Sequence, residues 1–190
     1  MILDLAACSD GELAGLTLGG NRSAFAAIMQ RHRDPIYRLI RSYIGDGEEA
    51  LDVTQETFAS AFHKLARFDP QRSMRAWLAG IAVNKSRDWR RRQRVRRILS
   101  FGASLPPGAI TDFGDETAGP DKLAADREQL ARVSMAVAEL PARLKETLLL
   151  RTIEGLSQAE TAAALSISEK AVETRLYRAR KQLTQKLSAF

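Results

Sequence analysis

The chain has 190 residues and a net charge of +6 at pH 7, with 45% hydrophobic and 27% charged residues. This balance is ordinary for a globular protein and excludes wholesale disorder. A single cysteine and two histidines exclude a disulfide framework and argue against a zinc site, so we expect no metal and no cofactor. The sequence contains neither a long apolar run nor a basic leader, so we expect a cytoplasmic protein.

Positive charge is concentrated in residues 85–97, where eight basic residues accompany one acid. This distribution and a sequence pI of about 9.8 indicate a polyanionic partner. A basic run can also be a solvated helix face or bind a membrane surface. The neighbouring Trp77 and Trp89 favour single-stranded nucleic acid, because bases stack on aromatic rings while arginines pair with phosphates.

Residues 100–126 differ in composition from both flanks. They carry five acids and one lysine, and recurrent prolines and glycines interrupt any helical or strand period. Structureless stretches of this length are rare inside one compact domain. We therefore predict a flexible acidic linker between an N-terminal domain, 1–99, and a C-terminal domain, 127–190, which move independently in the free protein.

Apolar residues recur at helical spacing through the first 99 residues, and strand-type alternation is absent. One stripe runs from Phe25 to Ile44, with a kink or a junction of two helices predicted at Asp34-Pro35. A second helix follows Gly47, and a third begins near Met74 and enters the basic run. The residues predicted to face inward from the second helix are Leu51, Phe58, Ala61, Phe62 and Leu65.

Four shorter helices are predicted after the linker, near 130–140, 144–153, 158–165 and 169–186. Ser157 and Glu160 match a capping box at the start of the third of these. A short helix, the turn 166–168 and a longer helix are typical of a helix-turn-helix. The outer face of the last helix offers Lys170, Thr174, Arg175, Arg178 and Lys181, with Tyr177 at its edge. Such a face can enter a major groove, although a helix bundle with a solvated basic face has the same pattern.

An acidic strip on the second predicted helix has a different character. Asp52, Gln55, Glu56 and Ala59 recur at helical spacing opposite the apolar stripe. Carboxylates repel DNA phosphates, so the strip is either a solvated face or a docking surface for a basic protein partner.

Several strings, taken together, resemble the extracytoplasmic-function (ECF) sigma factors of bacterial RNA polymerase. They are Asp-Val-Thr-Gln-Glu-Thr-Phe at 52–58, Arg-Phe-Asp at 67–69, Trp77-Leu78, Ile81-Ala82-x-Asn84, Leu140-Pro141, Gly-Leu-Ser-Gln-x-Glu at 155–160, and Val-x-Thr-Arg-Leu-Tyr-Arg-Ala-Arg at 172–180. Their order and spacing extend from about Asp10 to Leu187. The resemblance implies an all-α fold of two small helical domains, the second with a helix-turn-helix, that bind core RNA polymerase and promoter DNA.

The resemblance also implies roles for individual residues. The polymerase-docking residues would be Asp52, Gln55 and Glu56. The residues at the −10 element would be Asp69, Arg72, Ser73, Met74, Arg75, Trp77, Asn84, Lys85, Arg87 and Arg91. The residues at the −35 element would be Lys170, Thr174, Arg175, Tyr177, Arg178 and Lys181. The family is usually held inactive by an anti-sigma factor, often membrane-bound, which gives the expected third partner.

We therefore expect an alternative sigma factor that directs core polymerase to promoters and helps melt the −10 region, with no catalysis and no small-molecule substrate of its own. The main alternative is a self-sufficient two-domain DNA-binding regulator, and a helical adaptor that binds only protein is a third. Two positions depart from the family pattern. Leu51 stands where an acid is common, and Glu173 stands where a basic residue is frequent.

Overall fold

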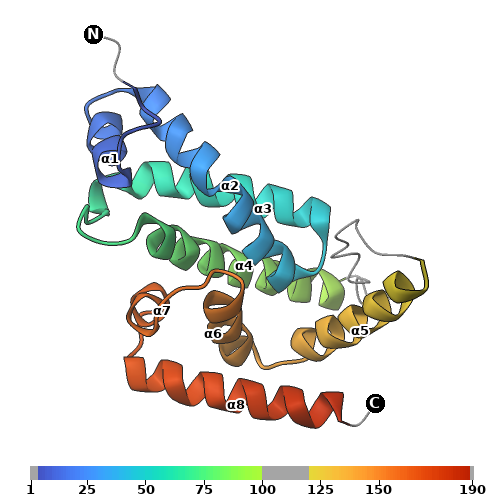
Figure 1. Cartoon of the computed structure of the whole chain (residues 1–190). Coiled ribbons are helices and arrows are strands. Elements are labelled where there is room, and N and C mark those ends of the chain that lie inside the picture. The colour runs from blue at the N-terminus through green and yellow to red at the C-terminus, as the bar shows by residue number, and fades with distance from the viewer. Residues whose placement is uncertain (1–3, 100–119, 189–190) are drawn as a thin grey trace.

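The computed structural model describes residues 4–99 and 120–188, and within these ranges the regular elements are helices (Figure 1). The N-terminal half consists of α1 (Asp10–Leu18), α2 (Arg22–Ile44), α3 (Gly47–Lys64), a 3-10 turn (Leu65–Arg67) and α4 (Met74–Leu99). The C-terminal half consists of α5 (Pro120–Ala138), α6 (Ala142–Thr152), α7 (Gln158–Leu165) and α8 (Glu169–Leu187). The all-α prediction is confirmed. None of the described helices is long and apolar enough to cross a bilayer.

Short polar side chains fix where the helices begin. The Asn21 side chain accepts a hydrogen bond from the backbone N–H of Ala24 at 3.3 Å, and Asp46 does the same for Glu49 at 3.1 Å. These bonds satisfy amides that have no partner within their helix. Between the two caps, Gly45 ends α2 with φ 87°, a left-handed conformation that costs glycine little.

Of the two predicted outcomes at Asp34-Pro35, a junction of two helices is absent, because α2 continues through Pro35 as one helix. An interior proline removes a backbone donor and disfavours a helix. Here the buried residues Ile28, Ile36 and Ile40 keep one apolar stripe on both sides of Pro35. Tertiary packing of that stripe therefore outweighs the local penalty.

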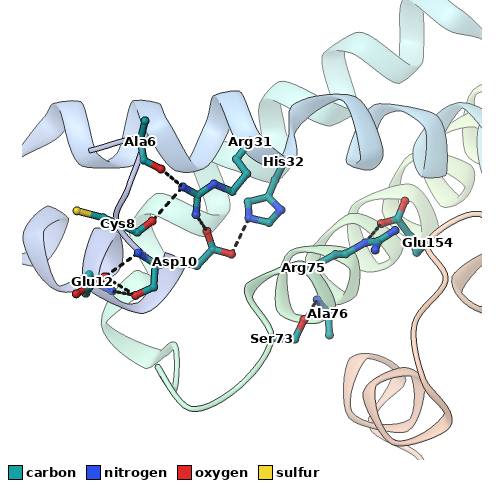
Figure 2. Close-up of polar contacts among 11 residues, drawn as sticks. Ala6, Cys8, Asp10, Glu12, Arg31, His32, Ser73, Arg75, Ala76 and Glu154 are labelled. Carbon is teal, nitrogen blue, oxygen red and sulfur yellow. Dashed lines mark hydrogen bonds and ion pairs between the residues drawn. The ribbon is translucent and has the colours of Figure 1, made fainter. Parts of the chain in front are cut away.

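Helix α1 was not predicted from the sequence. Ser9 and Glu12 form a capping box at its start, with the Ser9 N–H donating to the Glu12 carboxylate at 2.7 Å. The Asp10 carboxylate then lies 2.6 Å from an Arg31 nitrogen and 2.9 Å from His32 Nε2 on α2 (Figure 2). These contacts pin the short helix against the bundle, and the Ser9-x-x-Glu12 spacing is the signal that could have revealed it.

Helices α2, α3 and α4 enclose the core of the N-terminal half. The largest side chains almost fully removed from solvent there include Ile28, Ile36, Leu39, Ile40, Leu65 and Leu78. Two inward assignments on α3 were wrong, since Leu51 is 42% exposed and Phe62 is 44% exposed. The buried stripe of α3 is centred instead on Val53, Thr57 and Ala61, so Leu51 and Phe62 lie at its margins.

The C-terminal half begins earlier than predicted. Helix α5 starts at Pro120, so residues 120–126 of the predicted linker are helical, whereas 100–119 lie outside the described residues. Proline suits the first position of a helix because its fixed φ is already helical and no N–H partner is needed there. Leu140, Leu144, Leu148 and Ala179 then form a small core between α6 and α8.

The two halves pack against each other, with α6 and α7 between α4 and α8 (Figure 1). Leu149, Leu150, Leu156 and Leu165 of the C-terminal half belong to the same buried cluster as the core of the N-terminal half. The structure thus shows a shared apolar interface between the halves, and independent movement of the two domains in the free protein stays a prediction. Helical periodicity marks these leucines as buried but does not identify the surface that covers them.

Candidate nucleic-acid and protein interfaces

The outer face of α8 is a cationic surface turned away from the rest of the protein (Figure 1). Its exposed side chains are Lys170, Thr174, Tyr177, Arg178 and Lys181. Val172 and Ala179 are buried on the opposite face. The positions of Tyr177 and Arg175 are the reverse of the expectation, since Tyr177 is 68% exposed on the outer face and Arg175 is half-buried at its edge.

The turn before α8 sets the geometry of a helix-turn-helix. Ser166 ends α7 in the left-handed region, with φ 54° and ψ 48°. Two residues later, the Ser168 side chain accepts from the Ala171 N–H at 3.2 Å and caps α8. At the exposed start of α8, Lys170 Nζ lies 2.9 Å from the Glu173 carboxylate. Glu173 therefore forms an ion pair with Lys170, one of the residues predicted to bind DNA.

The loop and first turn of α4 hold the first predicted −10 residues. Asp69 and Arg72 form an exposed ion pair at 3.4 Å. The Ser73 hydroxyl accepts from the Ala76 N–H at 3.2 Å (Figure 2). Met74 is only 2% exposed and belongs to the core. Its assignment to the DNA surface therefore fails in this structure, because the amphipathic start of α4 turns that side chain inward.

The remaining predicted −10 residues lie along α4. Trp77 is half-buried and packs on Phe68, with the ring centroids 5.3 Å apart. Asn84 is exposed, and its Oδ1 accepts from Arg87 at 3.1 Å. Arg91 pairs with Asp88 at 3.1 Å. These side chains spread over several turns of the helix rather than meeting at one point.

A polar seam joins the basic run of α4 to the acids of α3. The Glu56 carboxylate lies 3.4 Å from both Lys85 and Arg92, and Glu49 accepts a hydrogen bond from the Trp89 indole at 2.6 Å. Partial burial acts to raise the pKa of Glu56, but the hydrogen bonds and charges of Arg92 and Lys85 outweigh it and lower the pKa. The seam places Trp89 in a structural role within the N-terminal half.

The residues of the predicted docking strip on α3 differ in their exposure to solvent and in their ion pairs. Asp52 and Gln55 are exposed on α3, whereas Glu56 is half-buried and bound to α4. Leu51 and Phe62 are exposed on the same helix. The departure at Leu51 therefore leaves an apolar side chain on the surface beside Asp52, rather than placing one in the core.

A cluster of charged side chains between the two halves was not predicted. The Glu146 carboxylate accepts two hydrogen bonds from the Arg87 guanidinium, at 2.8 and 2.6 Å, and a third from the Tyr43 hydroxyl at 3.1 Å. Arg75 Nε lies 3.2 Å from Glu154 (Figure 2). The side chains of Glu146 and Glu154 are each 1% exposed.

Lys145 completes this cluster. Its ammonium group donates to the backbone oxygen of Tyr43 at 2.9 Å and is buried. Burial, and then the nearby charge of Arg90, lower the pKa of Lys145 from 10.5 to about 8. Burial, and then the charge of Glu146, raise the pKa of Tyr43 to about 12. The structure buries every residue from 144 to 150. In the sequence, the Lys145-Glu146 pair inside this otherwise largely apolar stretch is the feature that could have indicated the cluster.

Comparison with known proteins assigns both halves to one family. Residues 28–96 match the model of sigma-70 region 2, and residues 130–183 match that of sigma-70 region 4. The chain is 40% identical over 187 residues to the RNA polymerase sigma factor CnrH of Cupriavidus metallidurans, covering 95% of each chain. It is 30% identical over 177 residues to the ECF sigma factor SigD of Mycobacterium tuberculosis, covering 90% of this chain and 81% of SigD.

The chain belongs to the ECF sigma factors. Its structure is also similar to that of CnrH solved in complex with the cytosolic domain of CnrY, with 35% identity, a TM-score of 0.69, and coverage of 95% of this chain and 97% of CnrH. The fold is shared with the sigma factor RpoE solved in complex with the anti-sigma factor NepR from Bartonella quintana. That match has 21% identity, a TM-score of 0.71, and coverage of 86% and 96%.

As a sigma factor, the protein binds core RNA polymerase, directs it to promoters and helps melt the −10 region. Its relatives are sigma factors, which are not enzymes, and the polymerase supplies the catalysis. The family assignment explains why one small chain combines a cationic recognition helix with an acidic surface.

Proposed function

We propose that this sigma factor divides its work among three surfaces: α3 docks on core polymerase, α4 with its preceding loop binds the −10 element, and α8 reads the −35 element. The observation that carries the proposal is the separation of charge. A cationic helix-turn-helix face and two exposed acids of α3, Glu48 and Asp52, lie on one chain, and these acids repel the DNA that the cationic face attracts.

The composition of the strip supports a protein partner for α3. Asp52 and Gln55 are exposed, and the apolar side chains of Leu51 and Phe62 are exposed on the same helix. Positions 51, 55 and 62 are four and seven residues apart, which places them on one face. Apolar side chains interleaved with polar ones are typical of protein interfaces rather than of phosphate-binding surfaces.

The assignment of α4 rests on its charge and its aromatic side chain. Arg75, Lys85, Arg87 and Arg91 supply guanidinium and ammonium groups that pair with phosphates. Trp77 is half-buried and packs on Phe68, so only part of its ring is available to stack on a base.

The assignment of α8 rests on its outer face and its N-terminus. Lys170 and Thr174 lie within the first two turns, followed by Tyr177 and Arg178 on the same exposed surface. In helix-turn-helix proteins the N-terminal residues of the second helix contact base edges in the major groove. Glu173 can accept a hydrogen bond from the amino group of cytosine, which would make the Lys170–Glu173 pair part of the −35 preference.

We further propose that an anti-sigma factor regulates this protein and that this protein acts in the cytoplasm. The support is that similar chains were solved with such partners: CnrH with the cytosolic domain of CnrY, and RpoE with NepR.

The decisive experiment is selection from a pool of random-sequence duplex DNA, with and without core polymerase. With core enzyme, the chain should enrich DNA carrying two sequence elements at a fixed spacing. Without core enzyme, it should enrich none above background. Enrichment of the same elements by the chain alone would contradict the proposal and favour a self-sufficient regulator.

A further inference from the structure

A cavity of about 710 Å³ lies between the two halves of the chain. Its walls come from the C-terminal parts of α2 and α4 on one side and from α5, α6 and α8 on the other (Figure 1). The described residues that line it include none of those assigned to polymerase or DNA. Small-molecule sites usually have volumes of about 300–1,000 Å³, so this cavity is large enough to hold a ligand of its own.

The greater part of the cavity wall is apolar. It is formed by side chains of four helices, namely Ile44, Leu130, Val133, Val137, Leu148 and Leu183. Burying a hydrocarbon chain against such side chains is favourable in proportion to the area removed from water. The wall therefore suits an alkyl chain.

Two cations lie together in this wall, on the ring of Tyr43. The Lys145 ammonium and the Arg90 guanidinium are each 5.5 Å from the centroid of that ring, and all three residues line the cavity. Lys145 is only 5% exposed. Because both cations contact one ring, positive charge is concentrated at a single place in an otherwise apolar cavity.

Hydrogen-bond donors at this place lack partners among the described residues. Arg90 Nη1 and Ser42 Oγ are buried and form no hydrogen bond within the described part of the chain. The Lys145 ammonium has three N–H donors, and it donates to the backbone oxygen of Tyr43 at 2.9 Å. Buried donors without a partner cost free energy, so an acceptor that entered the cavity would be stabilised here.

The charge of the two cations is also uncompensated. Glu146 belongs to the same cluster, but its carboxylate oxygens accept from Arg87 and Tyr43. Within the ranges that the structure describes, neither Lys145 nor Arg90 forms an ion pair with a carboxylate. The lowered pKa of Lys145 has the same cause, since burial and the charge of Arg90 act on it without a paired acid.

We propose that this cavity binds an amphiphilic carboxylate of the fatty-acid class, with the head group at Lys145, Arg90 and Ser42 and the alkyl chain along Leu130, Val133 and Leu148. A carboxylate accepts several hydrogen bonds and supplies the missing negative charge. A neutral amphiphile would leave the cations uncompensated, and a cationic one would be repelled by them.

The volume of the cavity favours such a ligand over a segment of another protein. An α-helix with its side chains is about 11 Å across and rises 5.4 Å per turn, which amounts to roughly 500 Å³ per turn. The cavity therefore holds little more than one turn of helix. An unbranched alkyl chain is narrower and can follow the apolar wall.

The test measures binding of decanoate to the full chain by isothermal titration calorimetry at pH 7.5, below the critical micelle concentration. We expect one site per chain, with decanoate binding at least about tenfold more tightly than decanol, because hydrogen bonds to charged groups are strong. Decyltrimethylammonium should not bind. Dodecanoate should bind roughly tenfold more tightly than decanoate, because it buries two more methylene groups.

Two double variants locate the head group. R90M/K145M removes both cations while keeping apolar side chains of similar length, and it should weaken decanoate binding at least about tenfold. R33M/K186M is the matched control, since it removes the same charge from α2 and α8 outside the cavity lining, and it should bind as the natural chain does. Circular dichroism checks that each variant keeps its helix content.

A second pair of variants locates the alkyl chain without changing charge. Ser134 of α5 lines the cavity, so Ser134→Trp should fill the space and abolish decanoate binding. Ala131 is exposed on the same helix outside the cavity lining, so Ala131→Trp should leave binding unchanged.

Proton uptake gives a readout that a purely structural role of Lys145 would not produce. At pH 8.5 the free chain has largely released the Lys145 proton, because the pKa is about 8. A bound carboxylate raises that pKa, so each decanoate should bring about 0.5 proton or more into the complex. Calorimetry in buffers of different ionisation enthalpy measures this uptake, and Lys145→Met should eliminate it.

Three results would each overturn the proposal. The first is equal affinity for decanoate and decanol, which would reduce the site to an apolar cavity. The second is an affinity of R90M/K145M or Ser134→Trp equal to that of its control. The third is binding to phosphatidylglycerol vesicles without binding of monomeric decanoate, which would indicate a membrane surface instead.

Discussion

Ser166 is the one non-glycine residue with positive φ among the described residues, and it lies in the turn of the helix-turn-helix. A side chain in the left-handed region normally costs about 1–2 kcal/mol, and a short polar side chain reduces that cost. The angle between α7 and α8 depends on this turn. The strained backbone at Ser166 therefore sets the direction of α8.

Ser166→Gly should raise the free energy of unfolding by up to about 1 kcal/mol, because glycine adopts this conformation without a Cβ penalty. Ser166→Val should lower it, because a β-branched residue resists positive φ. Urea denaturation followed by circular dichroism checks both. A glycine variant less stable than the natural chain would show that Ser166 is not strained.

Arg175 and Arg178 should differ in kind, because Arg175 lies nearer the N-terminus of α8, where helix-turn-helix proteins contact base edges, and Arg178 lies almost one turn farther along. We expect Arg178→Ala to weaken all promoters alike, as loss of a phosphate contact does. Arg175→Ala should cost about 1–3 kcal/mol and relax one −35 position. Transcription from a library of promoter variants distinguishes the two, and equal losses on every promoter would remove the base-reading role from Arg175.

At the scale of elements, α3 combines a structural seam with the proposed docking surface. Glu56 forms ion pairs with Lys85 and Arg92, whereas Asp52 and Gln55 are exposed to solvent. A charge reversal at Glu56 would place three cations together and disturb the contact of α3 with α4. Asp52 and Gln55 are therefore the positions at which docking can be tested without disturbing the fold.

D52R/Q55R should abolish binding to purified core polymerase while changing the free energy of unfolding by less than about 0.5 kcal/mol, as is usual for exposed sites. D34R, at an exposed acid of α2, is the control and should retain binding. Wild-type affinity of D52R/Q55R for core polymerase would show that α3 is not the docking helix.

Lys145 of α6 carries an ammonium group that is buried where α6 contacts α2. At pH 9 the unfolded chain keeps the Lys145 proton, since its ordinary pKa is 10.5, whereas the folded chain, with a pKa of about 8, has released it. The unfolded state then binds more protons, so the free energy of unfolding rises with pH. Tyr43 acts in the opposite direction only above pH 10, because its pKa is raised from 10.0 to about 12.

Between pH 8 and pH 10 the contribution of Lys145 should increase stability by on the order of 2 kcal/mol. Urea denaturation at several pH values measures this change. Lys145→Met is the control, and its pH dependence over this window should be flatter. Parallel curves for the two proteins would contradict burial of the Lys145 ammonium against Tyr43.

At the scale of the whole molecule, local patterns predicted the helices and the helix-turn-helix, because periodicity and capping residues such as Ser157 and Glu160 act over a few positions. They did not predict that α4 would meet α7, since contacts between distant segments leave no periodic signal. Glu146 and Glu154 illustrate the limit. As single acids they resemble surface residues, and only the packed structure shows that they bind Arg87 and Arg75.

The predicted −10 residues show the same limit of local patterns. Charge identified the stretch that contains Arg87, and resemblance identified Arg75, but neither identified the carboxylates that hold them. Met74 was placed at the DNA surface by resemblance, and the packing of α4 buries it instead. Whole-molecule packing therefore determines which residues of a correctly located helix are accessible.

The most direct test of the central claim is run-off transcription on total genomic DNA of the source organism, using core polymerase with and without the chain, followed by sequencing of RNA 5′ ends. We predict that the chain creates a discrete set of new 5′ ends that share two upstream elements at constant spacing. D52R/Q55R should eliminate this set. Identical 5′ ends with and without the chain would contradict its action as a sigma factor.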